Sequence, residues 1–361
     1  MNRIVLPLVL LSAGVLAERA DGAKRKVPQQ YPTLQAAIAA AAPHDVVVVG
    51  AGTYTESLWI QDVADVRIRG KKGAVLDGGG GPAAITLLNC QRVTVEGLTI
   101  RNADVGIATQ FVQGSTVDDC RFLDVADVAI ELFLAAACRV VDSRVTDVSG
   151  GGVRIEQSTG CVVERTRFLG VEDDAVTVSG SMHSILDNRF VDCGHIGIRV
   201  GDSGVPGEST LVAGNVLTAC GSESIQVRVG STGVTVLSNR IRKAKDDAIH
   251  AGDSVEWVVI AANVVKKASG SGILFHADES IVRKNRIVKA GGDGILVGAS
   301  THQTQFEANR VRKCANDGFL VDASGNSFVG NRARKNAAFD LHDLSGPAAN
   351  AYIDNVFGTT H

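Results

Sequence analysis

Aromatic residues are scarce in this chain of 361 residues. Phe, Trp and Tyr together make up 4% of it, although 45% of its residues are hydrophobic and 40 are glycine. This scarcity indicates that large rings do not make up most of the core. The abundance of Gly, Val, Ile and Ala instead predicts a fold that stacks small and β-branched side chains. The formal net charge is −3, so no global excess of positive charge indicates a nucleic acid partner.

Long apolar runs are also missing, with one short exception at the start. Residues 4–16 are largely apolar, Arg3 precedes them, and Val15-Leu16-Ala17 supplies the small residues of a cleavage site. This pattern predicts a secretory signal peptide at residues 1–17, too short for a transmembrane helix. We therefore expect a secreted protein, periplasmic or extracellular, with no transmembrane segment and a mature charge of about −4.

One pattern, apolar-x-x-Asn-x-apolar, recurs along most of the chain at intervals of 22 to 27 residues. Such a period is typical of a solenoid, in which each turn buries its apolar face only against its neighbours. The polar or small residue of the pattern stands at Cys120, Ser143, Thr166, Asn188, Asn215, Asn239, Asn263, Asn285, Asn309, Asn331 and Asn355.

Two columns of apolar residues keep the same period. Both belong to short stretches in which apolar and polar residues alternate, which is typical of a strand with one buried face. No repeat contains the longer helical pattern of an α/β solenoid. One column contains Val117, Val140, Val163, Ile185, Val212, Val236, Ile260, Val282, Phe306 and Phe328, and the other contains Ile107, Ile130, Val153, Val176, Ile198, Ile225, Ile249, Ile273, Ile295, Phe319 and Phe339.

The Asn column has a physical reason. Stacked coils lie about 4.8 Å apart, so identical amides at one bend can hydrogen-bond along the stack, and Asn tolerates the left-handed conformation that such bends need. Ser143 and Thr166 are expected to continue this ladder in the earlier coils. Five of the seven cysteines share inward positions with Val and Ala, namely Cys138, Cys161, Cys193, Cys220 and Cys314. We therefore expect small core residues rather than a metal site, with a Cys193–Cys220 disulfide as the less favoured alternative.

The first coils are preceded by a different segment. Residues 28–49 predict a cap, with an Ala-rich helix that begins after Thr33 as its N-cap and a strand at 46–49. Residues 50–361 then form the solenoid, with a closing coil at 349–361.

The chain resembles the pectin-lyase-like superfamily of right-handed parallel β-helices over roughly residues 28–361. The resemblance rests on the segments 31–38, 45–49, 52–56, 97–100 and 350–359 and on the repeated Asn-Arg-apolar steps. It implies an all-β, right-handed parallel β-helix of about 12 coils with an N-terminal capping helix. That superfamily includes lyases, hydrolases, esterases, epimerases and non-catalytic binders, so activity has to be argued from the site.

Ionisable side chains gather on one side of the middle coils, beside extra residues around 201–209 that lengthen one repeat. Solenoids often carry binding function on such an inserted loop. The alternative is that Asp residues at the bends merely cap turns, as Asp293 and Asp317 outside the cluster indicate. The candidate catalytic residues are Asp173, Asp174, His195, Arg199, Glu223, Asp247 and His250, and the candidate substrate-binding residues are Arg228, His276 and Asp246.

Several chemistries are compatible with these residues. Glu223 and Asp247, one coil apart, have about the 5 Å spacing of a retaining glycosidase, whereas Asp174 and Glu223, roughly 10 Å apart, stand at the long edge of inverting spacing. A lyase would instead use His195 or Arg199 as a base. The Asp173-Asp174 pair resembles a step of polygalacturonase-type glycosidases, but the carboxylate that precedes it in that family is absent near residues 150–152.

A second surface is basic. Arginine follows the ladder position at residues 121, 144, 167, 189, 240, 286, 310 and 332, and residues 239–335 contain 16 Lys and Arg against 10 Asp and Glu. Asp119, Asp142 and Asp187 adjoin the early arginines, whereas the later ones lack such neighbours. This stripe suits a linear polyanion, or it is a solvated face whose charges prevent lateral association.

Two functions from different classes follow. The first is a glycoside hydrolase or polysaccharide lyase acting on an extracellular, acidic or neutral, polysaccharide. The second is a non-catalytic scaffold that binds glycans or a cell surface. No metal or other cofactor is predicted, nothing in the sequence supports a Ca²⁺ requirement, and the oligomeric state has no signal in it.

Overall fold

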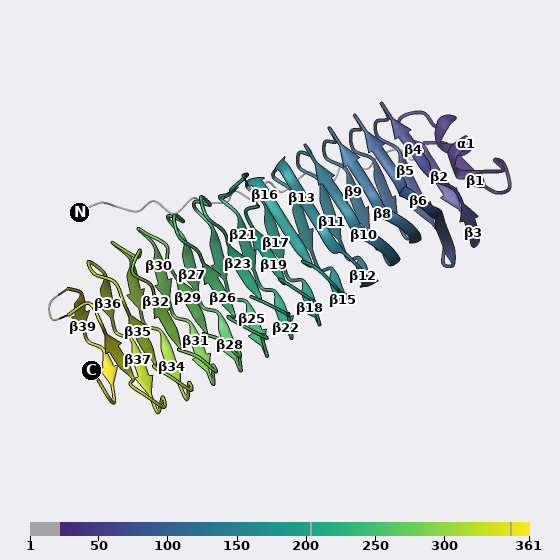
Figure 1. The fold of residues 1–361 in the computed structure, drawn as a ribbon. Helices are drawn as coiled ribbons and strands as arrows, with labels where there is room; N and C mark the ends of the chain where they lie inside the picture. Colours follow the sequence, from purple (N-terminus) through teal and green to yellow (C-terminus); the bar gives the residue numbers. More distant parts are fainter. Residues whose placement is uncertain (1–21, 203, 347–348) are drawn as a thin grey trace.

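A computed structural model describes residues 22–202, 204–346 and 349–361. It is an elongated solenoid of about 14 turns, almost entirely parallel β-strand (Figure 1). The predicted architecture is confirmed, with somewhat more turns than expected, because the first coils lack the Asn-type pattern. The predicted signal peptide lies outside the described residues. None of the described helices is long and apolar enough to cross a membrane.

Each turn contributes one strand to a first face, a continuous parallel sheet of 15 strands. Its strands are β1 Lys24–Val27, β2 Val46–Val49, β5 Arg67–Gly70, β7 Thr94–Glu96, β9 Thr116–Asp118, β11 Arg139–Val141, β14 Val162–Glu164, β17 Ser184–Leu186, β21 Leu211–Ala213, β24 Thr235–Leu237, β27 Val259–Ala261, β30 Ile281–Arg283, β33 Gln305–Glu307, β36 Ser327–Val329 and β39 Ala351–Ile353.

The second face follows the first along every turn. In the early coils, long strands cross from the second face to the third, namely β6 Ala74–Leu88, β8 Thr99–Gln110 and β10 Arg121–Phe133. The other strands of the second face are β3 Gly52–Thr55, β12 Arg144–Val148, β15 Arg167–Val171, β18 Arg189–Val191, β22 Val216–Thr218, β25 Arg240–Arg242, β28 Val264–Lys266, β31 Arg286–Val288, β34 Arg310–Arg312, β37 Arg332–Arg334 and β40 Val356–Phe357.

The third face carries most of the candidate site. Its strands are β4 Leu58–Gln61, β13 Gly151–Thr159, β16 Val176–Ser181, β19 Ile198–Val200, β23 Ile225–Val227, β26 Ile249–Ala251, β29 Ile273–Phe275, β32 Ile295–Val297, β35 Phe319–Val321 and β38 Leu341–Asp343. The short β20 Gly207–Glu208, from the inserted loop, pairs with the end of β16.

Strand pairing confirms the predicted register. The first apolar column runs unbroken from Val117 to Phe328 along the first face, and the second runs from Ile107 to Phe319 along the third. The prediction is wrong at its last member, because Leu341 and not Phe339 pairs with Phe319. Phe339 lies two residues earlier, at the bend, where its ring contacts His342.

The predicted Asn ladder is present and links neighbouring coils by hydrogen bonds. Each Asn Oδ1 accepts the backbone N–H of the ladder residue on the preceding coil, as Asn263 does from Asn239 at 2.8 Å, and each Nδ2 donates to a backbone carbonyl. Ser143 and Thr166 continue it, accepting from the N–H groups of Cys120 and Ser143. The left-handed residue of the bend, however, is the one before the ladder position, such as Ser238 (φ 56°) before Asn239.

The N-terminal end is closed by α1, Leu34–Ala39, beside β4 (Figure 1). Thr33 is its N-cap and accepts from Ala36 N–H. Leu34, Ala37 and Ile38 are buried, so this short helix covers the apolar end that the first coil would expose. All seven cysteines are buried and free, with no disulfide between Cys193 and Cys220.

Candidate functional site

A row of carboxylates lies at the bend between the second and third faces, two residues before strands β16, β23, β26, β32 and β35 begin. Three of them have the same role: the Oδ1 atoms of Asp174, Asp293 and Asp317 accept the backbone N–H of the equivalent residue on the next coil, at 3.1, 2.9 and 2.7 Å. Asp247 accepts from Ser271 N–H in the same way. The alternative interpretation, that Asp residues at the bends cap turns, therefore applies to these four residues.

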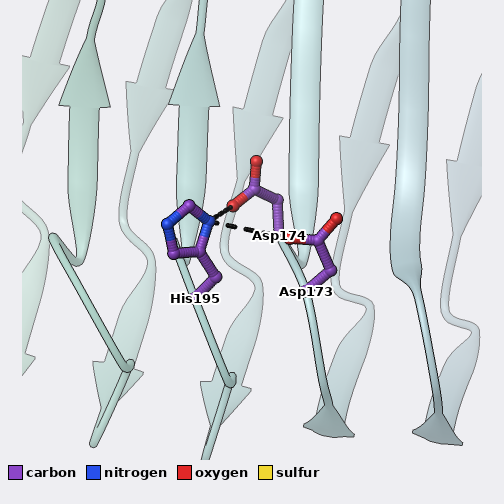
Figure 2. Close-up of side chains that lie close together, drawn as sticks. All are labelled: Asp173, Asp174 and His195. Carbon is purple, nitrogen blue, oxygen red and sulfur yellow. Dashed lines mark hydrogen bonds and ion pairs between the residues drawn. The ribbon is translucent and has the colours of Figure 1, made fainter.

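Asp174 is also the centre of a cluster (Figure 2). Its Oδ1 lies 2.8 Å from His195 Nδ1, and its Oδ2 lies 2.8 Å from Arg199 Nη2. Asp173 Oδ1 lies 3.6 Å from His195 Nδ1. His195 is in backbone register with Asp173, because Ile198 pairs with Val176, yet its ring reaches over to Asp174.

The side chains of this cluster differ in burial, and this difference indicates what each of them does. The Asp174 side chain is 7% exposed, whereas those of His195 and Asp173 are 49% and 59% exposed. Asp174 therefore orients the imidazole by engaging Nδ1, which leaves the second ring nitrogen, Nε2, of this half-exposed side chain for proton transfer. Asp173, Asp174 and His195 offer ligand atoms within 4.8 Å of one another, but the guanidinium of Arg199 already stands beside them, so a divalent cation would meet a fixed positive charge.

A shallow groove lies along the third face next to this cluster. It is lined by Gly151, Val153, Arg154, Glu156, Asp173, Asp174, Thr177, Arg199 and Asp202. Its four carboxylates outnumber its two guanidinium groups, so its wall favours positive over negative charge. Arg154, Glu156 and Thr177 were not among the predicted site residues, although their outward alternation on β13 and β16 is a signal that could have included them.

Glu223 belongs to the same row and is surrounded by three side-chain hydrogen-bond partners. His250 Nδ1 lies 3.2 Å from Oε1, Gln226 Nε2 donates to Oε1 at 3.3 Å, and Ser222 Oγ donates to Oε2 at 2.5 Å. The hydrogen bond with His250, supported by that from Ser222, lowers the pKa of Glu223 to about 2 against the opposing effect of burial. Glu223 is thus held as a carboxylate on the outer surface of the sheet.

Asp247 follows one coil later, and its pKa is shifted in the opposite direction. Ile225 pairs with Ile249, so Glu223 and Asp247 occupy the same position on adjacent coils, about 4.8 Å apart in the backbone. Burial raises the pKa of Asp247, the Ser271 N–H opposes this, and the charges of Asp246 and Glu223 add to the rise. Two neighbouring carboxyl groups with divergent pKa values are a common arrangement for an acid and its partner.

The three predicted substrate-binding residues are less closely associated. Arg228 Nη1 lies 3.8 Å from Asp202 Oδ1, next to the inserted loop. The rings of His276 and His250 are 6.1 Å apart, and His276 Nδ1 lies 3.5 Å from Asp253 Oδ1. Asp246 is exposed beside Asp247. The structure therefore gathers the predicted residues into two adjoining groups, around Asp174 and around Glu223, with Arg228 and His276 further along the strands.

Comparison with known proteins agrees with this geometry at the level of the fold. The family described as the right handed beta helix region matches residues 77–159 and 129–280, more than half of the chain. The family of the periplasmic copper-binding protein NosD matches residues 209–361. No curated protein sequence matches the chain.

Several solved structures are similar over most of the chain. The catalytic unit of an α-1,3-glucanase from Streptomyces thermodiastaticus has a TM-score of 0.62 at 14% identity, over 90% of this chain and 65% of its own. A periplasmic alginate epimerase has 0.63 at 12%, over 93% and 84%. A surface adhesin of Streptococcus pneumoniae has 0.55 at 13%, over 78% and 85%.

This chain spans just under two thirds of the glucanase unit, and identities this low establish the fold alone. Together with the pairing of the strands, the family match is decisive for the architecture: the chain belongs to the family of right-handed parallel β-helix proteins.

Proposed function

We propose that this protein is a periplasmic or extracellular glycoside hydrolase that cleaves a polysaccharide laid across the third face. The observation that carries the proposal is the pair Glu223 and Asp247, one coil apart with opposite pKa shifts. Their backbone spacing matches the roughly 5 Å that separates the carboxyl groups of retaining glycosidases.

In the proposed reaction, protonated Asp247 donates its proton to the glycosidic oxygen as the bond to the anomeric carbon breaks. The Glu223 carboxylate forms a bond to that carbon, giving a glycosyl-enzyme. Water then attacks the same carbon, Asp247 takes the water's proton, and Glu223 leaves as a carboxylate. His250 and Ser222 keep Glu223 ionised and fixed before the substrate arrives.

The neighbouring groove supports this assignment through its charge. Glycoside hydrolysis passes through a transition state with oxocarbenium character, and the excess of carboxylates around Asp173 and Asp174 stabilises positive charge. The glucanase and the epimerase act on polysaccharides according to their names, and the epimerase is periplasmic. These are analogies at the level of the fold, and they support a glycan as the substrate class and a location outside the cytoplasm.

A second reaction is favoured by a different observation, the Asp174–His195 pair with Arg199 beside it. A His base whose ring is oriented by a carboxylate, next to a guanidinium that can bind a uronate carboxylate, is an arrangement suited to β-elimination by a lyase. The acidic balance of the groove disfavours an anionic substrate there, which is why hydrolysis is the better supported reaction.

The test is to incubate the purified protein with neutral and acidic polysaccharides and to follow both new reducing ends and the ultraviolet absorbance of unsaturated products. New reducing ends that fall by about a hundredfold or more in Glu223→Gln and in Asp247→Asn would support hydrolysis. Asp293→Asn is the matched control, because Asp293 occupies the same bend position, shares the next-coil hydrogen bond of Asp247 and also has a raised pKa.

Unsaturated products that vanish in His195→Ala would contradict hydrolysis and establish the lyase. Absence of both products, with a polysaccharide still retained by the protein, would overturn the enzymatic proposal and favour a binding scaffold, the role that the name of the adhesin indicates for that protein.

A further inference from the structure

The second face changes character at Asn239. From there on, each turn from the ladder Asn to the following bend reads Asn-Arg-apolar-Arg-Lys or a close variant. Strand pairing aligns two rows along the solenoid, the first interrupted by Val264 and the second by Val288, and a third row follows each strand by one residue. The first row contains Arg240, Arg286, Arg310 and Arg332, the second Arg242, Lys266, Arg312 and Arg334, and the third Lys243, Lys267, Lys289, Lys313 and Lys335. We call these residues the cationic rows.

The cationic rows are exposed and lack counter-charges. All of their residues are solvent-exposed except Arg312, which is half-buried. Within the described residues, no ion pair joins any of them to a carboxylate, and none of the segments that carry them, from each ladder Asn to its Lys, contains Asp or Glu. Like charges on paired strands about 4.8 Å apart repel one another.

The backbone conformation of the lysine row is a second unfavourable feature of this surface. Each of its five residues has a left-handed backbone, with φ between 53° and 60°. That conformation is unfavourable for a side chain such as Lys and is better tolerated by Gly, Asn and Asp. In the first half of the solenoid the same bend position is filled by Asn102, Asp124, Asp147, Gly170, Asp192 and Ala219. The fold itself thus gives no reason for lysine at this position.

The rows also form the walls of a shallow groove. It is lined by Arg286, Arg310, Arg312, Arg332 and Arg334, with Val311, Ala333 and Val356 between them. Guanidinium groups recognise carboxylates and sulfates through paired N–H donors, and here they recur on successive coils. A ligand whose anionic groups repeat along its length can engage several rows at once (Figure 1 places β28, β31, β34 and β37 side by side).

We propose that the cationic rows bind a linear acidic polysaccharide lying along the solenoid axis, at a surface separate from the third face. The second-face strands β25, β28, β31, β34 and β37, which carry the first two rows, contain no aromatic side chain on which a nucleic acid base could stack. The few apolar residues of the groove are too small a surface to insert into a membrane. The inference does not depend on the reaction proposed for the third face. The function that it assigns to the cationic rows is attachment of the protein to an acidic polysaccharide matrix.

The experiment measures binding to immobilised polygalacturonate over a range of salt concentrations. The variant carries Arg286→Gln, Arg310→Gln and Arg332→Gln together. The matched control carries Arg121→Gln, Arg144→Gln and Arg167→Gln, which removes equal charge from the equivalent exposed position of earlier coils. We expect the first variant to bind about tenfold more weakly or worse, with a shallower dependence on salt, and the control to bind within about twofold of the wild type.

Equal losses in the two variants would overturn the proposal, because the binding would then reflect net charge and not the rows. Binding confined to vesicles of anionic phospholipid, or to single-stranded DNA, with none to polygalacturonate would overturn it too. Hydrolysis of a neutral polysaccharide provides the separate readout: it should be unchanged in the Arg286, Arg310 and Arg332 variant, whereas Glu223→Gln should abolish hydrolysis and leave polygalacturonate binding intact.

Discussion

The two halves of the second face have the same backbone arrangement but differ in whether acidic side chains accompany the basic ones. In each turn between Cys120 and Cys193, the Arg after the ladder position is followed three residues later by an Asp or Gly at the bend. Asp142 forms an ion pair with Arg165 of the next coil, with 2.8 Å between Oδ1 and Nε. It does not pair with Arg144, the neighbour that sequence proximity suggested. Between Asn239 and Lys335 the residue four positions after each ladder Asn is Lys, and within the described residues none of these lysines forms an ion pair with a carboxylate.

The ladder beneath differs as well. In the early coils it consists of Cys120, Ser143 and Thr166. The hydroxyls of Ser143 and Thr166 accept the N–H of the preceding coil but donate only within their own coil, to Val141 O and Glu164 O, and the Cys120 thiol is a weak donor to Val95 O. From Asn188 on, every ladder position has an Asn that both accepts and donates between coils. The half that carries the cationic rows, to which the described residues supply no ion pair, therefore also has more hydrogen bonds between its coils.

The largest expected effect is on the ladder. Asn263 is fully buried, accepts from Asn239 N–H and donates to Val236 O. Asn263→Ala leaves both groups unpaired, and we expect it to lower the free energy of unfolding by about 3 kcal/mol. Ser143→Ala, in the early coils, should cost about 1 kcal/mol. Denaturant titration of both variants measures the difference, and equal losses would remove the distinction between the two ladders.

The next effect concerns pH and compares Glu223 with Asp293, which share a bend position on the third face. The pKa of Glu223 is lowered to about 2, so its contribution is present above its ordinary pKa and is lost as the pH falls toward 2. We expect the wild type to lose on the order of 2 kcal/mol relative to Glu223→Gln over that range.

Asp293 should show the opposite sign. Burial raises its pKa, so the folded state favours the neutral acid and the carboxylate loses stability as the pH rises through that pKa. Asp293→Asn should therefore be as stable as the wild type, or slightly more stable, at neutral pH. Thermal unfolding as a function of pH measures both variants, and parallel curves for Glu223→Gln and the wild type would refute the assigned role of His250.

A smaller effect is expected at the cationic rows. Replacing Arg286, Arg310 and Arg332 with Gln relieves repulsion between paired strands, and we expect a gain of about 1 kcal/mol at low ionic strength that disappears in concentrated salt. Thermal unfolding at the two salt concentrations measures it. The Arg121, Arg144 and Arg167 variant should gain less, and a loss of stability in the first variant would show that these arginines have partners in solution.

The smallest effect is expected at the ion pair of Arg165 and Asp142, whose side chains are each about half exposed. Arg165→Gln should cost no more than about 0.5 kcal/mol. A double-mutant cycle with Asp142→Asn isolates the pair. A coupling well above that would show that the early half of the second face depends on its ion pairs.

The sequence by itself determined the architecture, because a solenoid repeats its buried positions at a fixed interval. The columns from Val117 to Phe328, the Asn ladder and the inward cysteines could all be placed on the correct face from that period alone. The prediction failed at Phe339, which lies 20 residues after Phe319, because the residue that keeps the shortest interval of the repeat, 22 residues, is Leu341, and Leu341 is the one that pairs.

Only the tertiary structure decided how side chains meet between coils. Register placed His195 beside Asp173, but the flexible ring pairs with Asp174. Glu223 and Asp247 were predicted as neighbours, yet their opposite pKa shifts depend on His250, Ser222 and Ser271, contributed by three different turns. Backbone spacing follows from repetition, whereas the direction of side chains such as His195 and His250 depends on partners that lie more than 20 residues away in sequence and a few ångströms away in space.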